Sequence, residues 1–135
     1  MGYQIEEIEG IGPVYAEKLG KAGITNTDHL LEKCGSRKGR DETEEATGVS
    51  ASTLLKWANM ADLMRISGVG EEYSELLEAA GVDTVKELRN RRPDNLTAKM
   101  EEVNADKSLV RKVPSESQVE KWVAQAKELD PMITH

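Results

Sequence analysis

Residues 8–19 read IEGIGPVYAEKL, and residues 66–77 read ISGVGEEYSELL. Aligned at an offset of 58 positions, the two stretches and the residues after them share nine identities: Ile8, Gly10, Gly12, Tyr15, Glu17, Leu19, Ala22, Gly23 and Leu30 fall on Ile66, Gly68, Gly70, Tyr73, Glu75, Leu77, Ala80, Gly81 and Leu88. A fixed offset between similar segments indicates that one structural unit is present twice. We therefore expect two copies of one module.

A second match lies nearer the end of each copy, at an offset of 65 positions. It pairs Ser50, Lys56, Trp57 and Ala61 with Ser115, Lys121, Trp122 and Ala126. The second copy is thus seven residues longer, and the extra residues belong either in the charged run 89–94 or in the segment 104–114. We expect a first module over residues 1–62 and a second module over residues 63–135, packed as one unit.

Local signals predict how the first helix of each module begins and ends. Residues 10–13 form a tight turn in which Pro13 takes the first helical position, where its missing N–H costs nothing. That helix is expected to end at Ala22. Gly23 then supplies a left-handed cap, and Ile24 folds back onto the helix.

Further caps mark later helices in both copies. Thr25 and Asp83 are expected to cap the second helix of each copy, and Ser50 and Ser115 the last one, with Gln118 completing a capping box. Aromatic residues make up only 4% of the chain and Phe is absent, a composition that suits packed helices better than strands. The predicted fold class is all-α, with two tandem helical modules.

Trp57 and Trp122 each lie on a stripe of apolar residues with the three-and-four spacing of an amphipathic helix. We expect both indoles to anchor the core, because burial is the common fate of a tryptophan on such a stripe. The alternative is that an indole binds a ligand.

The charge balance limits the partners that the protein can bind. The chain carries 18 Lys and Arg against 25 Asp and Glu, a net charge of −7, so any contact with DNA has to be local.

Cys34 is the single cysteine, which excludes a disulfide within the chain. No apolar run reaches the length of a membrane span, and the N-terminal residues are acidic. We expect a cytoplasmic protein with no membrane partner.

Residues 8–19 resemble the helix-hairpin-helix pattern, which has an apolar residue, then Gly-x-Gly, then alanine and an aliphatic residue at fixed distances. The second copy departs from it in having Ser74 where the pattern has alanine. The whole chain is similar to a bacterial family of uncharacterised proteins built from tandem helix-hairpin-helix modules and described as a domain of unknown function. This resemblance implies that each module has the motif followed by further short helices. It brings no established activity.

Two glycines so close together let the backbone turn sharply and leave N–H groups at the start of the next helix pointing outward, where an anion is favoured. The resemblance implies that these amides hold a DNA phosphate without reading the base sequence. The expected nucleic-acid-binding residues are Gly10, Ile11, Gly12, Val14, Lys18, Lys21, Gly68, Val69 and Gly70. The alternative is that the glycines only permit the turn and close helix packing.

The first turn is expected to bind phosphate better than the second. Lys18 and Lys21 follow the first turn on its helix, whereas Glu71 and Glu72 stand at the first helical positions after the second. A carboxylate about 4 Å from a phosphate costs roughly 1 kcal/mol in water and about 4 kcal/mol at a partly shielded surface. These acids suit the dipole of their own helix instead.

Basic clusters occur at corresponding places in the two copies: Lys33, Arg37, Lys38 and Arg40 in the first, and Arg89, Arg91 and Arg92 in the second. Their repetition is consistent with phosphate binding. The simpler interpretation, which we favour, is that cations stabilise helix C-termini and that exposed loops collect charge.

No catalytic or metal-binding constellation is recognisable, because His29 and His135 are the only histidines and Cys34 has no partner cysteine. We expect a non-enzymatic protein that needs no cofactor and no metal. The predicted function is weak, non-sequence-specific binding of double-stranded DNA through backbone phosphate contacts at the hairpins. The alternative is a protein–protein interaction or scaffold module, with another protein as partner, in which the motif serves the fold alone.

Overall fold

The computed structural model describes residues 3–135. Over these residues the chain is all-α, as the sequence predicts, and β-type pairing is limited to one isolated bridge between Gln4 and Asn26. The elements are the 3-10 helix η1 (Ile5–Glu7) and the α-helices α1 (Pro13–Lys21), α2 (Thr27–Cys34), α3 (Arg37–Thr47), α4 (Ala51–Leu63), α5 (Glu71–Ala79), α6 (Val85–Leu88), α7 (Pro93–Lys107) and α8 (Glu116–Glu128). None of these helices is both long enough and apolar enough to cross a membrane.

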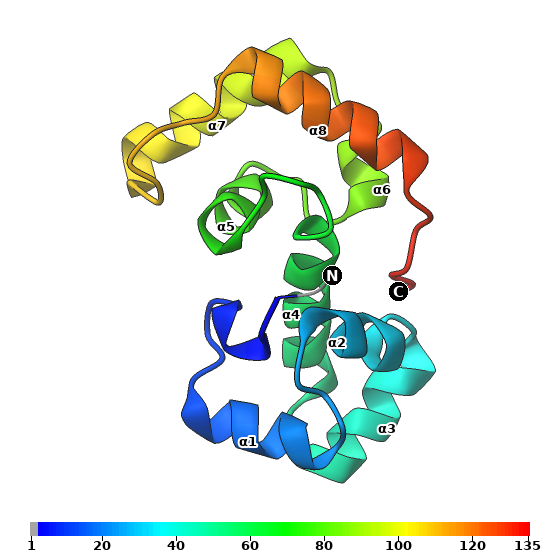
Figure 1. The fold of residues 1–135 in the computed structure, drawn as a ribbon. Coiled ribbons are helices and arrows are strands. Elements are labelled where there is room, and N and C mark those ends of the chain that lie inside the picture. Colours follow the sequence, from blue (N-terminus) through cyan, green and yellow to red (C-terminus); the bar gives the residue numbers. More distant parts are fainter. Residues whose placement is uncertain (1–2) are drawn as a thin grey trace.

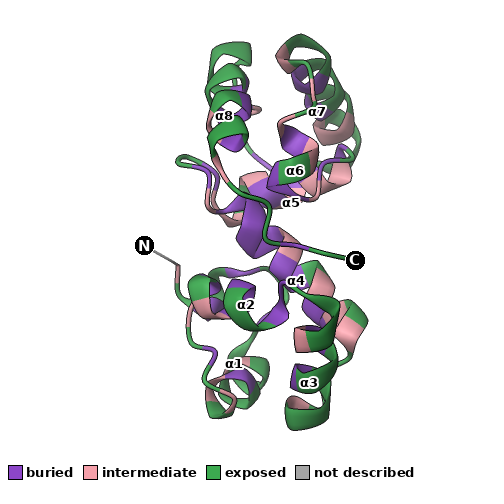
Figure 2. Cartoon of the chain, turned by 90° about the vertical axis from the view of Figure 1, so that its right-hand side faces the viewer, coloured by how far each residue is buried: buried purple, intermediate pink, exposed green. Residues whose placement is uncertain are grey.

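Helix α4 stands at the centre of the molecule and joins two groups of helices (Figure 1). On one side of it lie η1 and α1 to α3, and on the other side lie α5 to α8. The buried apolar side chains form two clusters that follow this division. The first core takes residues from the range 5–64 together with Ile133, and the second core takes residues from the range 63–126. Figure 2 shows that α4 is buried along much of its length, since both groups pack against it.

The helices of the two groups correspond in chain order, α1 to α4 with α5 to α8. Helix α5 begins 58 positions after α1, and α8 begins 65 positions after α4. Helix α7 has 15 residues against 11 in α3, and residues 108–115 connect α7 to α8 where only residues 48–50 connect α3 to α4. The extra length of the second copy therefore lies towards the segment 104–114 rather than in the run 89–94.

The first helix of each copy ends at a left-handed glycine, as predicted. Gly23 has a φ of +84°, and the amide of Ile24 donates to the carbonyl of Leu19 at 2.9 Å. This is the Schellman arrangement, which satisfies carbonyls that the helix leaves without a partner. Gly81 has a φ of +95° and ends α5 in the same way.

The serine caps of the last helices are confirmed. Ser50 accepts a hydrogen bond from the amide of Thr53 at the start of α4. Ser115 accepts one from the amide of Gln118 at the start of α8, and the Gln118 side chain accepts one in return from the amide of Ser115. Each cap satisfies an amide that the first helical turn leaves free.

The predicted caps of the second helices are wrong by one residue. Asn26, not Thr25, caps α2 through a bond of 2.8 Å from the amide of His29. In the second copy Thr84, not Asp83, caps α6. In each case two neighbouring residues have side chains able to cap a helix. Each helix begins one residue later than predicted, at Thr27 and at Val85, so the second of the two neighbours becomes the cap.

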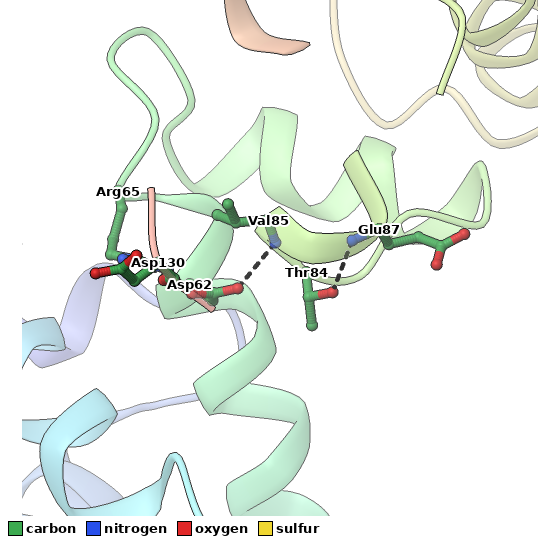
Figure 3. A network of polar contacts seen from close by, with 6 residues as sticks. All are labelled: Asp62, Arg65, Thr84, Val85, Glu87 and Asp130. Atoms are coloured by element: carbon green, nitrogen blue, oxygen red, sulfur yellow. Dashed lines mark hydrogen bonds and ion pairs between the residues drawn. The ribbon is translucent and has the colours of Figure 1, made fainter. Parts of the chain in front are cut away.

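A buried carboxylate holds the two groups of helices together (Figure 3). Asp62, near the end of α4, is 1% exposed, and its Oδ2 accepts a bond of 2.8 Å from the amide of Val85, the first residue of α6. Its Oδ1 accepts bonds of 3.0 and 2.6 Å from Arg65, whose guanidinium also donates to the carbonyl of Asp130 after α8. Because a buried charge is costly unless it is paired, this network fixes α4, α6 and the end of α8 relative to one another.

Candidate nucleic-acid interface

The first glycine turn, residues 8–12, leads directly into α1. Gly10 has a φ of +94°, a left-handed conformation that glycine adopts without strain. The amide of Ile11 donates to the carbonyl of Ile8 at 3.1 Å and closes the turn. Gly12 is extended and occupies the cap position of α1 without a side chain to fill it.

The start of α1 presents backbone donors that have no acceptor. Pro13 has no N–H, and within residues 3–135 the amides of Gly12, Val14 and Tyr15 make no hydrogen bond. No atom lies within 4 Å of the place where a Cβ on Gly12 would stand, so the approach is open. The first turn of α1 holds no acidic residue. Free amides at the positive end of a helix dipole favour an anion.

The second glycine turn, residues 66–70, has the same backbone but different charges. Gly68 has a φ of +92°, and the amide of Val69 donates to the carbonyl of Ile66 at 3.0 Å. Helix α5 then begins with Glu71 and Glu72 in its first turn, as the sequence shows. These carboxylates bring negative charge to the helix end at which a phosphate would have to bind.

Each turn rests on the tryptophan of its own copy. A Cβ on Gly10 would lie 3.4 Å from Nε1 of Trp57, and a Cβ on Gly68 would lie 3.3 Å from Nε1 of Trp122. Both tryptophans are 3% exposed, which confirms the prediction that they anchor the core. The structure also shows a second role of each indole that the sequence did not predict, which is to support the glycine turn of its own copy.

A tyrosine packs against each of these tryptophans. The rings of Tyr15 and Trp57 have centroids 5.1 Å apart at an interplanar angle of 68°, and those of Tyr73 and Trp122 are 5.4 Å apart at 53°. Tilted and edge-on arrangements of this kind are favourable for aromatic rings. The sequence repeats both tyrosine and tryptophan, and this coincidence is the signal from which the pairing could have been inferred.

Two of the predicted phosphate-binding residues do not offer a donor. Ile11 is 4% exposed and Val69 is fully buried, and the amide of each is bonded within its own turn. The sequence predicts both as phosphate contacts at the glycine turns. The tight turn instead directs their amides inward, so both residues shape the turn and contribute to the cores.

Val14 is accessible at the start of α1, whereas Lys18 and Lys21 lie in its last turn. Val14 is 67% exposed. The ammonium of Lys18 lies 5.7 Å from the ring centre of Tyr15, and Lys21 lies 3.6 Å from Glu17 in an exposed ion pair. An exposed ion pair such as that of Lys21 with Glu17 contributes little to stability, so it does not fix the position of the Lys21 side chain.

The two turns are linked by their carboxyl groups. A hydrogen bond to Glu9, in the first turn, is the largest of the effects that raise the pKa of Glu71 to about 6, ahead of burial and of the charges of Glu9, Glu75 and Glu72. Burial, followed by the charge of Glu9, also raises the pKa of Glu75. The sequence already shows Glu6, Glu7 and Glu9 before the first turn, whereas the approach of Glu71 and Glu75 to Glu9 is seen only in the structure.

The first basic cluster is partly structural. Arg40 is 3% exposed, and its guanidinium donates to the carbonyls of Cys34 at 3.1 Å, Gly35 at 3.0 Å and Thr134 at 2.5 Å. These contacts lie at the end of α2, where a cation is favoured by the helix dipole. Arg40 therefore cannot serve as a phosphate ligand in this fold.

The second basic cluster is held by nearby acceptors. Arg91 donates to Glu87 at 2.6 Å and to the carbonyl of Gly81 at 3.0 Å, beyond the end of α5. Arg92 pairs with Asp94 at 3.0 Å, and this pairing lowers the pKa of the Asp94 carboxyl. The contacts of Arg91 and Arg92 agree with the simpler interpretation of the basic clusters as structural charge.

Within residues 3–135, the His, Cys, Asp and Glu side chains form no group of three or more that could hold a metal ion. Cys34 is buried, and that burial raises the pKa of its thiol. A thiol in this environment is a poor nucleophile. The accessible chemistry of the first turn is therefore that of free amides and lysines.

A family model described as a domain of unknown function (DUF4332) matches residues 9–129. The matched range begins within the first glycine turn and ends just after α8, so it includes both groups of helices. No curated protein matches the chain, and no solved structure does.

Proposed function

The chain belongs to the family described as a domain of unknown function, DUF4332, and since that description names no activity, we propose an activity from the geometry of the first glycine turn. The protein is a non-catalytic module that binds double-stranded DNA weakly and without sequence preference. It holds a backbone phosphate at the first glycine turn. In this proposal both glycine turns are helix-hairpin-helix motifs, and only the first retains phosphate binding.

The observation that carries the proposal is the open start of α1. The amides of Gly12, Val14 and Tyr15 have no acceptor within the described residues, and no side chain caps the helix. Three donors at the positive end of a helix are suited to phosphate oxygens. Contacts to phosphate position a protein on DNA without reading its sequence.

The side chains around this helix end favour the first turn over the second. Lys18 lies on α1 and is exposed, whereas the second turn leads into Glu71 and Glu72. Repulsion between one carboxylate and a phosphate about 4 Å away reaches about 4 kcal/mol at a partly shielded surface. That cost is comparable with the stabilisation from one or two hydrogen bonds to a charged group, about 1.5–3 kcal/mol each.

Binding at the first turn is expected to be weak and sensitive to salt. Glu9 and Glu71 lie beside it, and the chain as a whole has a net charge of −7. An overall negative charge slows the encounter with a polyanion. Contact with only one or two phosphates predicts that the logarithm of the binding constant falls with the logarithm of the salt concentration with a slope of about −1 to −2.

The two turns provide a matched test. We would compare Gly12→Asp with Gly70→Asp, since both glycines have negative φ and neither would bring a Cβ within 4 Å of another atom. Binding to fluorescent duplexes of two unrelated sequences would be measured by anisotropy at several salt concentrations. Gly12→Asp and Lys18→Glu should weaken binding at least about fivefold, from the added repulsion. Gly70→Asp should weaken it less, by no more than about twofold, because in this proposal its added charge lies at the turn that holds no phosphate.

Three outcomes would contradict the proposal. The unaltered protein could fail to bind either duplex at low salt. It could bind one sequence much more tightly than the other. Gly12→Asp and Gly70→Asp could also weaken binding equally, in which case the effect would come from total charge and not from the first turn.

A second candidate function is protein binding at the same helix end. It is favoured by the exposure of Val14 at 67% and of Tyr15 at 41%, two apolar contacts beside an acidic turn. A photo-crosslinking residue in place of Val14, with the same residue in place of Glu72 as control, would test it in host cells. A protein adduct specific to position 14 supports this candidate, and adducts at both positions or at neither oppose it.

A further inference from the structure

The last residues of the chain return from the second group of helices to the first. After α8 the chain runs back past α4 to the side of α2 and α3 (Figure 1). We call residues 130–134 the strap. It has no regular secondary structure, so its position depends on the contacts that it makes along the way.

Hydrogen bonds hold both ends of the strap. At its start, the carbonyl of Asp130 accepts a bond of 2.9 Å from Arg65, which follows α4. At its end, the amide of Thr134 donates to the carbonyl of Gly35 at 2.8 Å, and the carbonyl of Thr134 accepts a bond from the buried Arg40. The strap is thus bonded both beside the second core and at the end of α2.

A single side chain of the strap enters the first core. Ile133 is 8% exposed and belongs to the first core, although it lies beyond all helices of the second. Its neighbour Met132 is 37% exposed. Burial of one branched apolar side chain, together with the bonds of Thr134, gives the strap a defined docked position.

Gly35 gives the strap room to pass. Its φ is −68°, which any residue adopts, so backbone conformation does not require a glycine there. A Cβ on Gly35 would lie 2.4 Å from the carbonyl oxygen of Met132 and 2.6 Å from that of Leu31. The glycine therefore permits the close approach of the strap and the end of α2.

We propose that the strap is a clamp that couples the two cores. While it is docked, the first core unfolds together with the second. When it is released, α2 and α3 loosen first, because the first core loses Ile133 and Arg40 loses its acceptor on Thr134. This coupling acts through the fold and does not depend on DNA binding.

Each core contains one tryptophan, which allows the two to be followed separately in the full chain. Trp57 lies in the first core and Trp122 in the second. Protein labelled with 5-fluorotryptophan would give one fluorine resonance for each core during thermal unfolding. We would compare the unaltered protein with Ile133→Asp, and with Met132→Asp as the matched control on the adjacent, exposed residue.

In the unaltered protein and in Met132→Asp, the two folded resonances should disappear together. In Ile133→Asp, the Trp57 resonance should disappear at least about 10 °C below that of Trp122, as expected when a core loses a buried branched side chain. Equal shifts of both resonances in Ile133→Asp would overturn the proposal. Separate transitions in the unaltered protein would also overturn it.

Ile133→Ala provides the test if Ile133→Asp does not fold. Native-state hydrogen exchange followed by mass spectrometry would then compare α2 and α3 with α7 and α8. Faster exchange confined to α2 and α3, by about tenfold or more, supports release of the first core alone. An equal increase in α7 and α8, or no change at α2 and α3, overturns the coupling.

Discussion

Replacing Asp62 by alanine should destabilise the protein strongly, although the residue lies far from the first glycine turn along the chain. The substitution removes both oxygens of a carboxylate that is 1% exposed. The amide of Val85 then loses an acceptor at 2.8 Å, and Arg65 loses its partner at 2.6 Å. Helix α6 would start with an unpaired buried donor, and the link from α4 to the end of α8 would weaken.

The magnitude follows from these contacts. A hydrogen bond from a buried amide to a charged acceptor contributes about 1.5–3 kcal/mol. Removing one partner of a buried ion pair costs about 3–5 kcal/mol. Because the Arg65 side chain is 17% exposed and keeps its bond to Asp130, the ion-pair loss lies below that range. We expect Asp62→Ala to lower the free energy of unfolding by about 3–4 kcal/mol in total.

The assay is equilibrium urea unfolding followed by circular dichroism. The matched control is Asp106→Ala, since Asp106 is exposed on α7 and its side chain makes no hydrogen bond or ion pair with any described residue. That control should change the free energy of unfolding by less than about 0.5 kcal/mol. A loss below about 1 kcal/mol in Asp62→Ala would refute the view that this carboxylate holds the two groups of helices together.

Two further predictions concern the glycine turns. Gly10→Ala should lower the free energy of unfolding by about 1–3 kcal/mol because alanine is strained at a positive φ, whereas Gly12→Ala, at a negative φ with open space around it, should change it by less than about 1 kcal/mol, since the smaller entropy of the unfolded chain offsets the poorer N-cap. Equal effects of the two substitutions in urea unfolding would contradict the first prediction. The second prediction concerns the pH dependence of stability. The folded state raises the pKa of Glu71 from 4.5 to about 6, so folding favours the protonated form of this side chain. The resulting stabilisation is fully present below pH 4.5 and is lost as the pH rises through about 6. The unaltered protein should therefore gain stability relative to Glu71→Gln as the pH falls from about 7 to about 5, and parallel stability curves for the two proteins would oppose this linkage.

Most predictions that rest on a few neighbouring residues agree with the structure, and the exceptions are the caps predicted at Thr25 and Asp83, which lie one residue further along the chain. The glycine cap at Gly23 and the serine caps at Ser50 and Ser115 depend on groups within about four positions along the chain. Burial of Trp57 and Trp122 follows from the apolar stripe on one helix. These features need no knowledge of distant parts of the chain.

Predictions that depend on packing were incomplete. The sequence predicted that the cluster containing Arg40 stabilises a helix C-terminus or lies in an exposed loop, but it did not predict that Arg40 is buried and also bonds the carbonyl of Thr134. Ile11 and Val69 were expected to offer amides to a phosphate, but the turn closes on those same amides. In each case the sequence identified the hydrogen-bond donor but not the acceptor to which it bonds. Several acceptors compete for one donor, and only the folded arrangement selects among them.

The amino-acid sequence by itself determined the helical class of the chain, the two glycine bends, the glycine caps of α1 and α5 and the serine caps of α4 and α8, because short-range hydrogen bonding and backbone conformation control them. The tertiary structure alone decided that Glu9 meets Glu71, that Asp62 binds the start of α6 and that Ile133 completes the first core. These contacts join residues that are far apart in the chain. They form only when packed helices bring the chain segments together, and no local pattern in the sequence encodes that approach.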